Sequence, residues 1–166
     1  MAASGSMRAS SRWRMTVTRP EPMAFRFSRR VGIGDCDLTG IAFHPAYVAM
    51  LVEALEALFA SVGSPWPEAM RDQRLGFPTV RLNLEFRRPT LYGETLDFTV
   101  VVVAIGRSSV DLVTTVHVAG ELAWRAEHRL VQTSLTDHRA REWGAGLRAG
   151  LLRHMDAERS AANPAP

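Results

Sequence analysis

The chain has 166 residues, a length that suits one domain able to bury a core without disulfides or metal ions. Its apolar fraction of 46% and charged fraction of 22% are those of an ordinary globular protein. The formal net charge is +3, but no basic stripe interleaved with aromatic residues follows the chain, which disfavours a nucleic-acid-binding protein.

Membrane insertion and secretion are also disfavoured. No apolar run reaches the roughly 18 residues of a membrane span, because Glu53 and Glu56 interrupt the most apolar stretch, residues 46–60. The arginine-rich first residues are not followed by the apolar segment of a secretory signal. Cys36 is the only cysteine, so no internal disulfide forms, which fits a reducing compartment. We therefore expect a cytoplasmic protein.

Hydrophobic periodicity predicts the elements in chain order. Residues 1–22 lack a sustained period and are predicted to be a disordered tail, followed by one domain over 23–138. Within it we expect a strand over 24–33, a long apolar helix from Pro45 to about Val62 and a helical turn over 67–74. Strands are expected over 80–86, 95–105, 110–118 and 122–136. Residues 139–166 form a C-terminal extension, with a short helix over 143–155 and then a disordered tail. This order predicts an α+β fold, with one antiparallel sheet covering one helix.

The most informative segment is the run GDCDLTGIAFHPAY over residues 34–47. It places Asp35 and Asp37 in a tight polar turn just ahead of the long helix. Proline is favoured in a first helical turn and forces extended geometry on the residue before it, so His44 is expected to be the N-cap of the helix at Pro45. A helix N-terminus offers unpaired N–H groups and a positive dipole end. A carboxylate that attacks or steers water, beside donors for an oxyanion, fits an acyl-transfer site.

Three motifs together resemble the 4-hydroxybenzoyl-CoA thioesterase family, over roughly residues 24–137. The first is GDCDLTGI at 34–41, which runs into Pro45-Ala46-Tyr47. The second is LGFPTV at 75–80, which opens the strand after the helix and leads to Asn83. The third is RPTLYGE at 88–94, which is similar to the family pattern Arg-Pro-x-x-Tyr-Gly-Asp.

The resemblance implies a hotdog fold, in which a five-stranded antiparallel sheet wraps around one long central helix. It further implies an acyl-CoA substrate, a homodimer or homotetramer with an active site shared across the dimer interface, no metal, and no cofactor apart from the CoA of the substrate. The family's catalytic carboxylate is that of the second Asp in the Asp-x-Asp pair, which here is Asp37. Its oxyanion donors are backbone N–H groups at the start of the helix, near His44, Ala46 and Tyr47.

A single carboxylate suffices for this chemistry. An ordinary Asp has a pKa of about 3.9, so Asp37 is expected to be ionised at neutral pH. It either attacks the thioester carbonyl, forming a mixed anhydride that water opens, or holds a water in line. The leaving thiol has a pKa of about 8.5 and departs without a strong general acid, so no Ser-His-Asp triad is required.

Four other candidates lie near this segment or just after the helix, and two of them, His44 and Trp66, carry two interpretations each. The His44 side chain either steers water and assists thiolate departure, as the resemblance implies from relatives with His at this position, or is solvated beside the helix end. Tyr47 is expected mainly in the core, and Asp35 is expected to order the turn. Trp66 either lines the acyl pocket or closes over the core as a loop aromatic.

The remaining candidates lie on the strands and their turns. Thr79 and Asn83 are candidates for the substrate pocket, although Asn83 could simply face a sheet edge. Arg88, Arg107 and Ser108 are candidates for contacts with CoA phosphates, which the planar guanidinium suits, against the alternative of ordinary solvated residues.

The sequence leaves the acyl group open, as well as the choice between nucleophilic and general-base chemistry. Val52 stands where relatives often carry a carboxylate, which puts recognition of a hydroxylated aryl group in doubt. Two rivals stay open beside the acyl-CoA thioesterase. One is a carrier-protein thioesterase or dehydratase of a biosynthetic pathway, and the other is a non-catalytic acyl-CoA-binding module.

Overall fold

The computed structural model of the protein describes residues 24–155, so the predicted N-terminal tail and the end of the C-terminal extension lie outside the described residues. The elements, in chain order, are β1 (Phe25–Arg30), the 3-10 helix η1 (Ile33–Asp35), α1 (His44–Ser61), α2 (Trp66–Asp72), β2 (Leu75–Gly76), β3 (Thr79–Phe86), β4 (Thr95–Ile105), β5 (Ser109–Val118), β6 (Glu121–Val131), β7 (Thr133–Ser134) and α3 (Ala145–Leu152).

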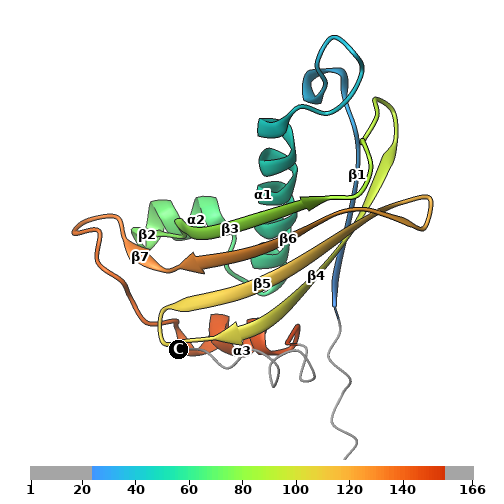
Figure 1. The fold of residues 1–166 in the computed structure, drawn as a ribbon. Coiled ribbons are helices and arrows are strands. Elements are labelled where there is room, and N and C mark those ends of the chain that lie inside the picture. The colour runs from blue at the N-terminus through green and yellow to red at the C-terminus, as the bar shows by residue number, and fades with distance from the viewer. Residues whose placement is uncertain (1–23, 156–166) are drawn as a thin grey trace, which may run out of the picture.

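Five strands form one antiparallel sheet in the order β1-β4-β5-β6-β3, so β1 and β3 are its edges. Helix α1 lies against one face of this sheet, with the loop after β1 at one end of the helix and α2 at the other (Figure 1). The predicted α+β fold, a five-stranded antiparallel sheet around one long helix, is confirmed. Strands β2 and β7 pair separately as a second, two-stranded sheet.

Helix α1 supplies the centre of the core. Eight of its 18 residues are buried, among them Met50, Leu55 and Phe59 with no exposed surface. They pack against the inward row of the strands, where Phe98 and Trp124 are equally buried. The helix is rich in Ala and Leu, which are strong helix formers, so local propensity and burial favour the same structure.

The start of α1 differs from the prediction. Phe43, with extended backbone, is the N-cap, and His44 is the first helical residue, so the expected N-cap role of His44 is wrong. Pro45 falls at the second helical position, where its missing N–H costs no intrahelical hydrogen bond.

Two predicted strands are also shorter than expected. The first ends at Arg30, where the chain turns into η1. The last, expected over 122–136, ends at Val131 and resumes as β7. At this break, the Gln132 amide N–H donates to the Ser108 carbonyl and the Gln132 side-chain Nε2 donates to the Glu142 carbonyl, 2.7 Å away.

The segment after β7 is part of the core. Trp143 and Leu151 are buried in the same cluster as α1. The carbonyl of His154 accepts a hydrogen bond of 2.8 Å from the Val102 amide and so extends the sheet beyond β1. Helix α3 lies against the end of α1 so closely that a Cβ on Gly150 would come within 2.6 Å of the Val62 Cβ.

Replacing either of two glycines of α3 by alanine should therefore change the free energy of unfolding in opposite directions. Gly150→Ala should destabilise the protein by about 1–3 kcal/mol through overpacking against Val62. Gly146→Ala, where no atom lies within 4 Å of the new Cβ, should be neutral or stabilise by about 0.5–1 kcal/mol through helix propensity. Urea unfolding of both variants measures the difference. Equal effects at the two positions would contradict the tight packing of α3 on α1.

Candidate functional site

The Asp37 carboxylate lies in an exposed turn, where it accepts hydrogen bonds from Thr39. Its Oδ1 accepts hydrogen bonds from the Thr39 amide at 2.8 Å and from the Thr39 hydroxyl at 2.5 Å. These bonds hold the pKa of Asp37 below its ordinary value, so the carboxylate is charged at neutral pH. The Asp37 amide donates to Ile41, and Cys36 bridges to Ala42, so the turn closes a short hairpin that leads directly into α1.

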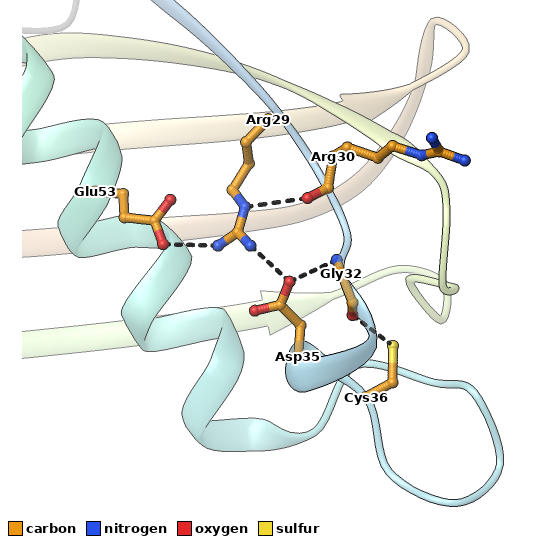
Figure 2. Close-up of polar contacts among 6 residues, drawn as sticks. All are labelled: Arg29, Arg30, Gly32, Asp35, Cys36 and Glu53. Atoms are coloured by element: carbon orange, nitrogen blue, oxygen red, sulfur yellow. Dashed lines mark hydrogen bonds and ion pairs between the residues drawn. The ribbon is translucent and has the colours of Figure 1, made fainter.

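Asp35 has a different environment. Its Oδ2 accepts from the Gly32 amide at 2.8 Å and from Arg29 at 2.6 Å, while Arg29 also reaches Glu53 of α1 at 2.8 Å (Figure 2). The structure thus gives Asp35 the contacts of a residue that orders the turn, and it directs Glu53 toward β1. Burial, followed by the charges of the two aspartates, raises the pKa of the intervening Cys36, which therefore stays a thiol.

The first turn of α1 has few free amides. Pro45 has none, the Ala46 amide donates to the Phe43 carbonyl at 2.9 Å, and the Phe43 amide donates to the Asp35 carbonyl at 3.1 Å. Helix geometry gives the Tyr47 amide the Phe43 carbonyl as its partner. Among residues 24–155, the amide of His44 is the one in this turn for which no acceptor is found. Of the three predicted oxyanion donors, His44 therefore fits that role best.

A groove of about 400 Å³ opens at this helix end. It is lined by Ile41, Ala42, His44, Tyr47, Phe86, Arg87, Arg88 and Pro89. The His44 ring is exposed and lies edge-on to Phe86, with ring centroids 6.0 Å apart. Tyr47 is buried between Phe86 and Trp124, and its hydroxyl accepts from the Thr90 amide, so its side chain packs as expected.

Arg88 is held by an internal partner. Its guanidinium binds Glu94 at 2.8 Å, which raises the pKa of Arg88. Burial raises the pKa of Glu94, but the hydrogen bonds from Arg88 and from the Leu91 amide outweigh burial, so the net pKa is lowered. The RPTLYGE motif therefore forms a closed turn around its own ion pair. Arg88 borders the groove, but its charge is already neutralised within the chain.

The other predicted residues lie at the opposite end of the sheet. Thr79 begins β3, and Arg107 and Ser108 form the hairpin between β4 and β5. Arg107 is exposed and pairs with Glu142 at 3.3 Å. Trp66 packs against Phe59 and Phe77, with ring centroids 5.6 and 5.5 Å away, which is the arrangement of an aromatic that closes over the core.

We call the part of the sheet around Asp37, His44 and Phe86 the loop end, and the part around Thr79 and Arg107 the hairpin end. Strand β3 runs from one to the other over eight residues, a length of about 23 Å. Within one chain, the structure brings Asp37, His44 and Arg88 to the loop end but leaves the second group far from them. Asn83 joins neither group, because it pairs with Glu127 on the face of the sheet that points away from α1.

Sequence reasoning missed His128 at the hairpin end. This residue of β6 is 3% exposed, and its Nε2 lies 2.7 Å from the Thr79 hydroxyl. Burial lowers the pKa of His128 to about 4, so the imidazole is neutral at physiological pH. Its place in the row of Trp124, Ala126 and Leu130 was the available signal, since alternate residues of a strand share a face.

Neither metal ligation nor a simple membrane span is found in the described part of the chain. Over residues 24–155, no group of three or more His, Cys, Asp or Glu side chains is arranged to hold a metal ion. No single helix there is long and apolar enough to cross a membrane. Helices α1 and α2 together reach the length and composition, but they are bent by 72° and one face of α1 is buried in the core.

Comparison with known proteins identifies the family. The profile of the Thioesterase-like superfamily matches residues 31–151, which include the Asp37 turn, α1 and the whole sheet except β1. The chain therefore belongs to the Thioesterase-like superfamily, and the resemblance seen in its motifs is confirmed at this level.

Individual relatives agree with this assignment. The chain is 30% identical over 74 residues to a 1,4-dihydroxy-2-naphthoyl-CoA hydrolase of Trichodesmium erythraeum, a match that covers 45% of the chain and 54% of the relative. The corresponding enzyme of Picosynechococcus sp. is 27% identical over 75 residues, 45% of the chain and 51% of the relative. The matched segments thus span about half the length of these curated relatives.

Solved structures extend the similarity over more of the chain. A thioesterase-superfamily protein of Jannaschia sp. is 25% identical with a TM-score of 0.75, covering 85% of this chain and all of that one. A 4-hydroxybenzoyl-CoA thioesterase bound to 4-hydroxybenzoyl-CoA is 24% identical with a TM-score of 0.70, covering 77% of this chain and 98% of that one. The predicted hotdog fold is confirmed.

The buried His128 predicts an acid-sensitive step in stability. Its pKa of about 4 in the folded protein lies below the ordinary 6.5. The neutral form therefore contributes stability that is present above pH 6.5 and lost as the pH falls toward 4, up to roughly 3 kcal/mol. We expect His128→Gln to flatten this part of the curve when unfolding free energies are measured in urea between pH 7 and 4.5. Parallel curves for variant and wild type would contradict the burial of a neutral imidazole.

Proposed function

We propose that the protein is an acyl-CoA thioesterase in which the ionised Asp37 is the catalytic carboxylate, acting as nucleophile or general base. The observation that carries this proposal is the charged Asp37 turn leading into the helix end where the His44 amide is free and a groove opens. Membership of the Thioesterase-like superfamily supports it, as does the similarity to 1,4-dihydroxy-2-naphthoyl-CoA hydrolases, which hydrolyse a CoA thioester. We propose a cytoplasmic location, with the single free Cys36 in support.

The division of labour follows from the contacts. The His44 amide, at the positive end of α1, stabilises the oxyanion that develops on the thioester carbonyl. The ionised Asp37 either attacks the carbonyl carbon, expelling CoA thiolate and leaving a mixed anhydride for water to open, or deprotonates an attacking water. The His44 imidazole borders the groove and can order that water. The apolar wall of Phe86 and Ile41 fits a hydrophobic acyl group.

We further propose that the working unit is a homodimer or homotetramer whose sites combine both ends of the sheet. Strand β3 is an uncovered edge with exposed apolar side chains, Val80 at 57% and Phe86 at 43%, and such edges pair readily with another strand. Antiparallel pairing of two copies along β3 would place the hairpin end of one subunit beside the loop end of the other. Thr79 would then approach the acyl group, and Arg107 with Ser108 the CoA phosphates, from across the interface.

Replacement of the carboxylate tests the activity. Asp37→Asn keeps the size and the turn but removes the charge, so turnover should fall at least about 100-fold. Thiol release from a panel of aromatic and short to medium acyl-CoAs measures it, and Asp72→Asn, an exposed acid at the end of α2, serves as control.

The same panel distinguishes the rivals. Unchanged turnover in Asp37→Asn would rule out the assigned role. Tight acyl-CoA binding without hydrolysis would favour a binding module, and turnover of only carrier-bound substrate would favour a carrier-protein thioesterase.

Subunit mixing tests the shared site. Thr79→Trp should block the pocket at the hairpin end, and Asp37→Asn disables the loop end. A mixed dimer of the two variants contains one doubly altered site and one intact site, so an equal mixture should recover about a quarter of wild-type activity after random exchange. Each variant alone gives the baseline, and size-exclusion chromatography checks that both still assemble. No recovery after verified exchange would show that each site lies within one chain.

A further inference from the structure

A charged side chain occupies the row of β1 that faces the core. Phe25, Phe27 and Arg29 alternate with exposed residues along this strand, so Arg29 continues an inward apolar row. Its side chain is 16% exposed, and the carboxylate of Asp35 that it contacts is 17% exposed. A guanidinium in such a place needs partners, because burying an unpaired charge is costly.

The partners come from two separate elements. One terminal nitrogen of Arg29 lies 2.6 Å from Asp35 Oδ2 in η1, and the other lies 2.8 Å from Glu53 Oε1 in the middle of α1. Figure 2 shows Arg29 between the helix and the turn, while the neighbouring Arg30 points away from both. The planar guanidinium fork binds both carboxylates at once, which an ammonium on a lysine stem matches poorly.

Asp35 carries this constraint to the site. Its Oδ2 also accepts from the Gly32 amide, and its backbone carbonyl accepts from Phe43, the N-cap of α1. Asp37, two residues later, is exposed and is held by contacts within its own turn. The hairpin that carries Asp37 is also bound to the RPTLYGE turn, because the Ala42 amide donates to the Thr90 carbonyl and the Tyr92 amide donates to the Gly40 carbonyl.

We propose that Arg29 is a positioning residue for the thioesterase reaction. Through Asp35 and Glu53 it fixes the loop that carries Asp37 relative to α1, and therefore relative to the His44 amide that receives the oxyanion. The inference rests on the proposed role of Asp37. A displacement of about 1 Å between a catalytic group and the bound substrate can cost about 100-fold in rate. The ion pairs of Arg29 with Asp35 and Glu53 therefore affect turnover more than binding.

The experiment compares kcat and KM in a set of single variants. Arg29→Met should lower kcat about 10- to 100-fold with KM within about twofold of wild type. Arg29→Lys should rescue part of the loss, because one carboxylate can still be reached. Glu53→Gln removes only the ion pair between Arg29 and α1, at a half-exposed position, and should lower kcat less, by a few fold. Arg26→Met is the matched control, since Arg26 is an exposed residue of the same strand, and it should keep wild-type kcat.

The outcomes separate the possible failures. The urea midpoint of unfolding is measured for each variant beside its kinetics. If the loss of activity follows the unfolded fraction, the role of Arg29 is purely structural and the proposal is overturned. Wild-type kcat in Arg29→Met, with Asp37→Asn inactive, overturns the positioning role alone. Full turnover in Asp37→Asn overturns the proposed function and the role of Arg29 with it. A drop in kcat of the folded Arg29→Met, partly restored by lysine, supports the proposal.

Discussion

The burial of α1 in the curve of the sheet is the constraint on which the rest of the structure depends. The helix has to lie where Met50, Leu55 and Phe59 reach the inward row of the strands, so its position is set by packing. Its N-terminus then falls beside the hairpin of Asp37 and the end of β3. The region around Asp37 and His44 thus takes its position from the core, because the Asp37 loop is attached to a helix that packing holds in place.

That attachment combines two kinds of interaction. Backbone hydrogen bonds join the Asp37 hairpin to the RPTLYGE turn. The ion pairs of Arg29 join Asp35, just before that hairpin, to Glu53 in the middle of α1. The internal Arg88–Glu94 pair keeps the RPTLYGE turn closed. Ion pairs near the surface contribute little to overall stability, but they fix relative positions well when several polar groups meet at one carboxylate, as they do at Asp35.

Much of the fold was predictable, because alternation and composition are local signals. The period-2 pattern of Val80 to Phe86, the apolar helix after Pro45 and the Ala119-Gly120 turn all correspond to elements of the structure. The Asp37 turn and the start of α1 were also found within one residue. The partners of Arg29 could not be, since a charged residue in a strand is ordinarily assigned to the solvent face, and Glu53 lies 24 residues away. The separation of Thr79 and Arg107 from Asp37 follows from strand pairing, which no local pattern contains.

The packing of Gly150 on Val62 has a consequence for how the protein is made. The end of α1 and the open end of β4 are covered by Trp143, Leu151 and the chain that follows them. A ribosome delivers the chain from its N-terminus, so the helix at the centre emerges long before the segment that seals it. The sheet also pairs β1 with β4 and β3 with β6, across long intervening stretches. The nascent protein therefore carries an exposed apolar surface until late in synthesis, which makes it a natural client for chaperones that shield such surfaces.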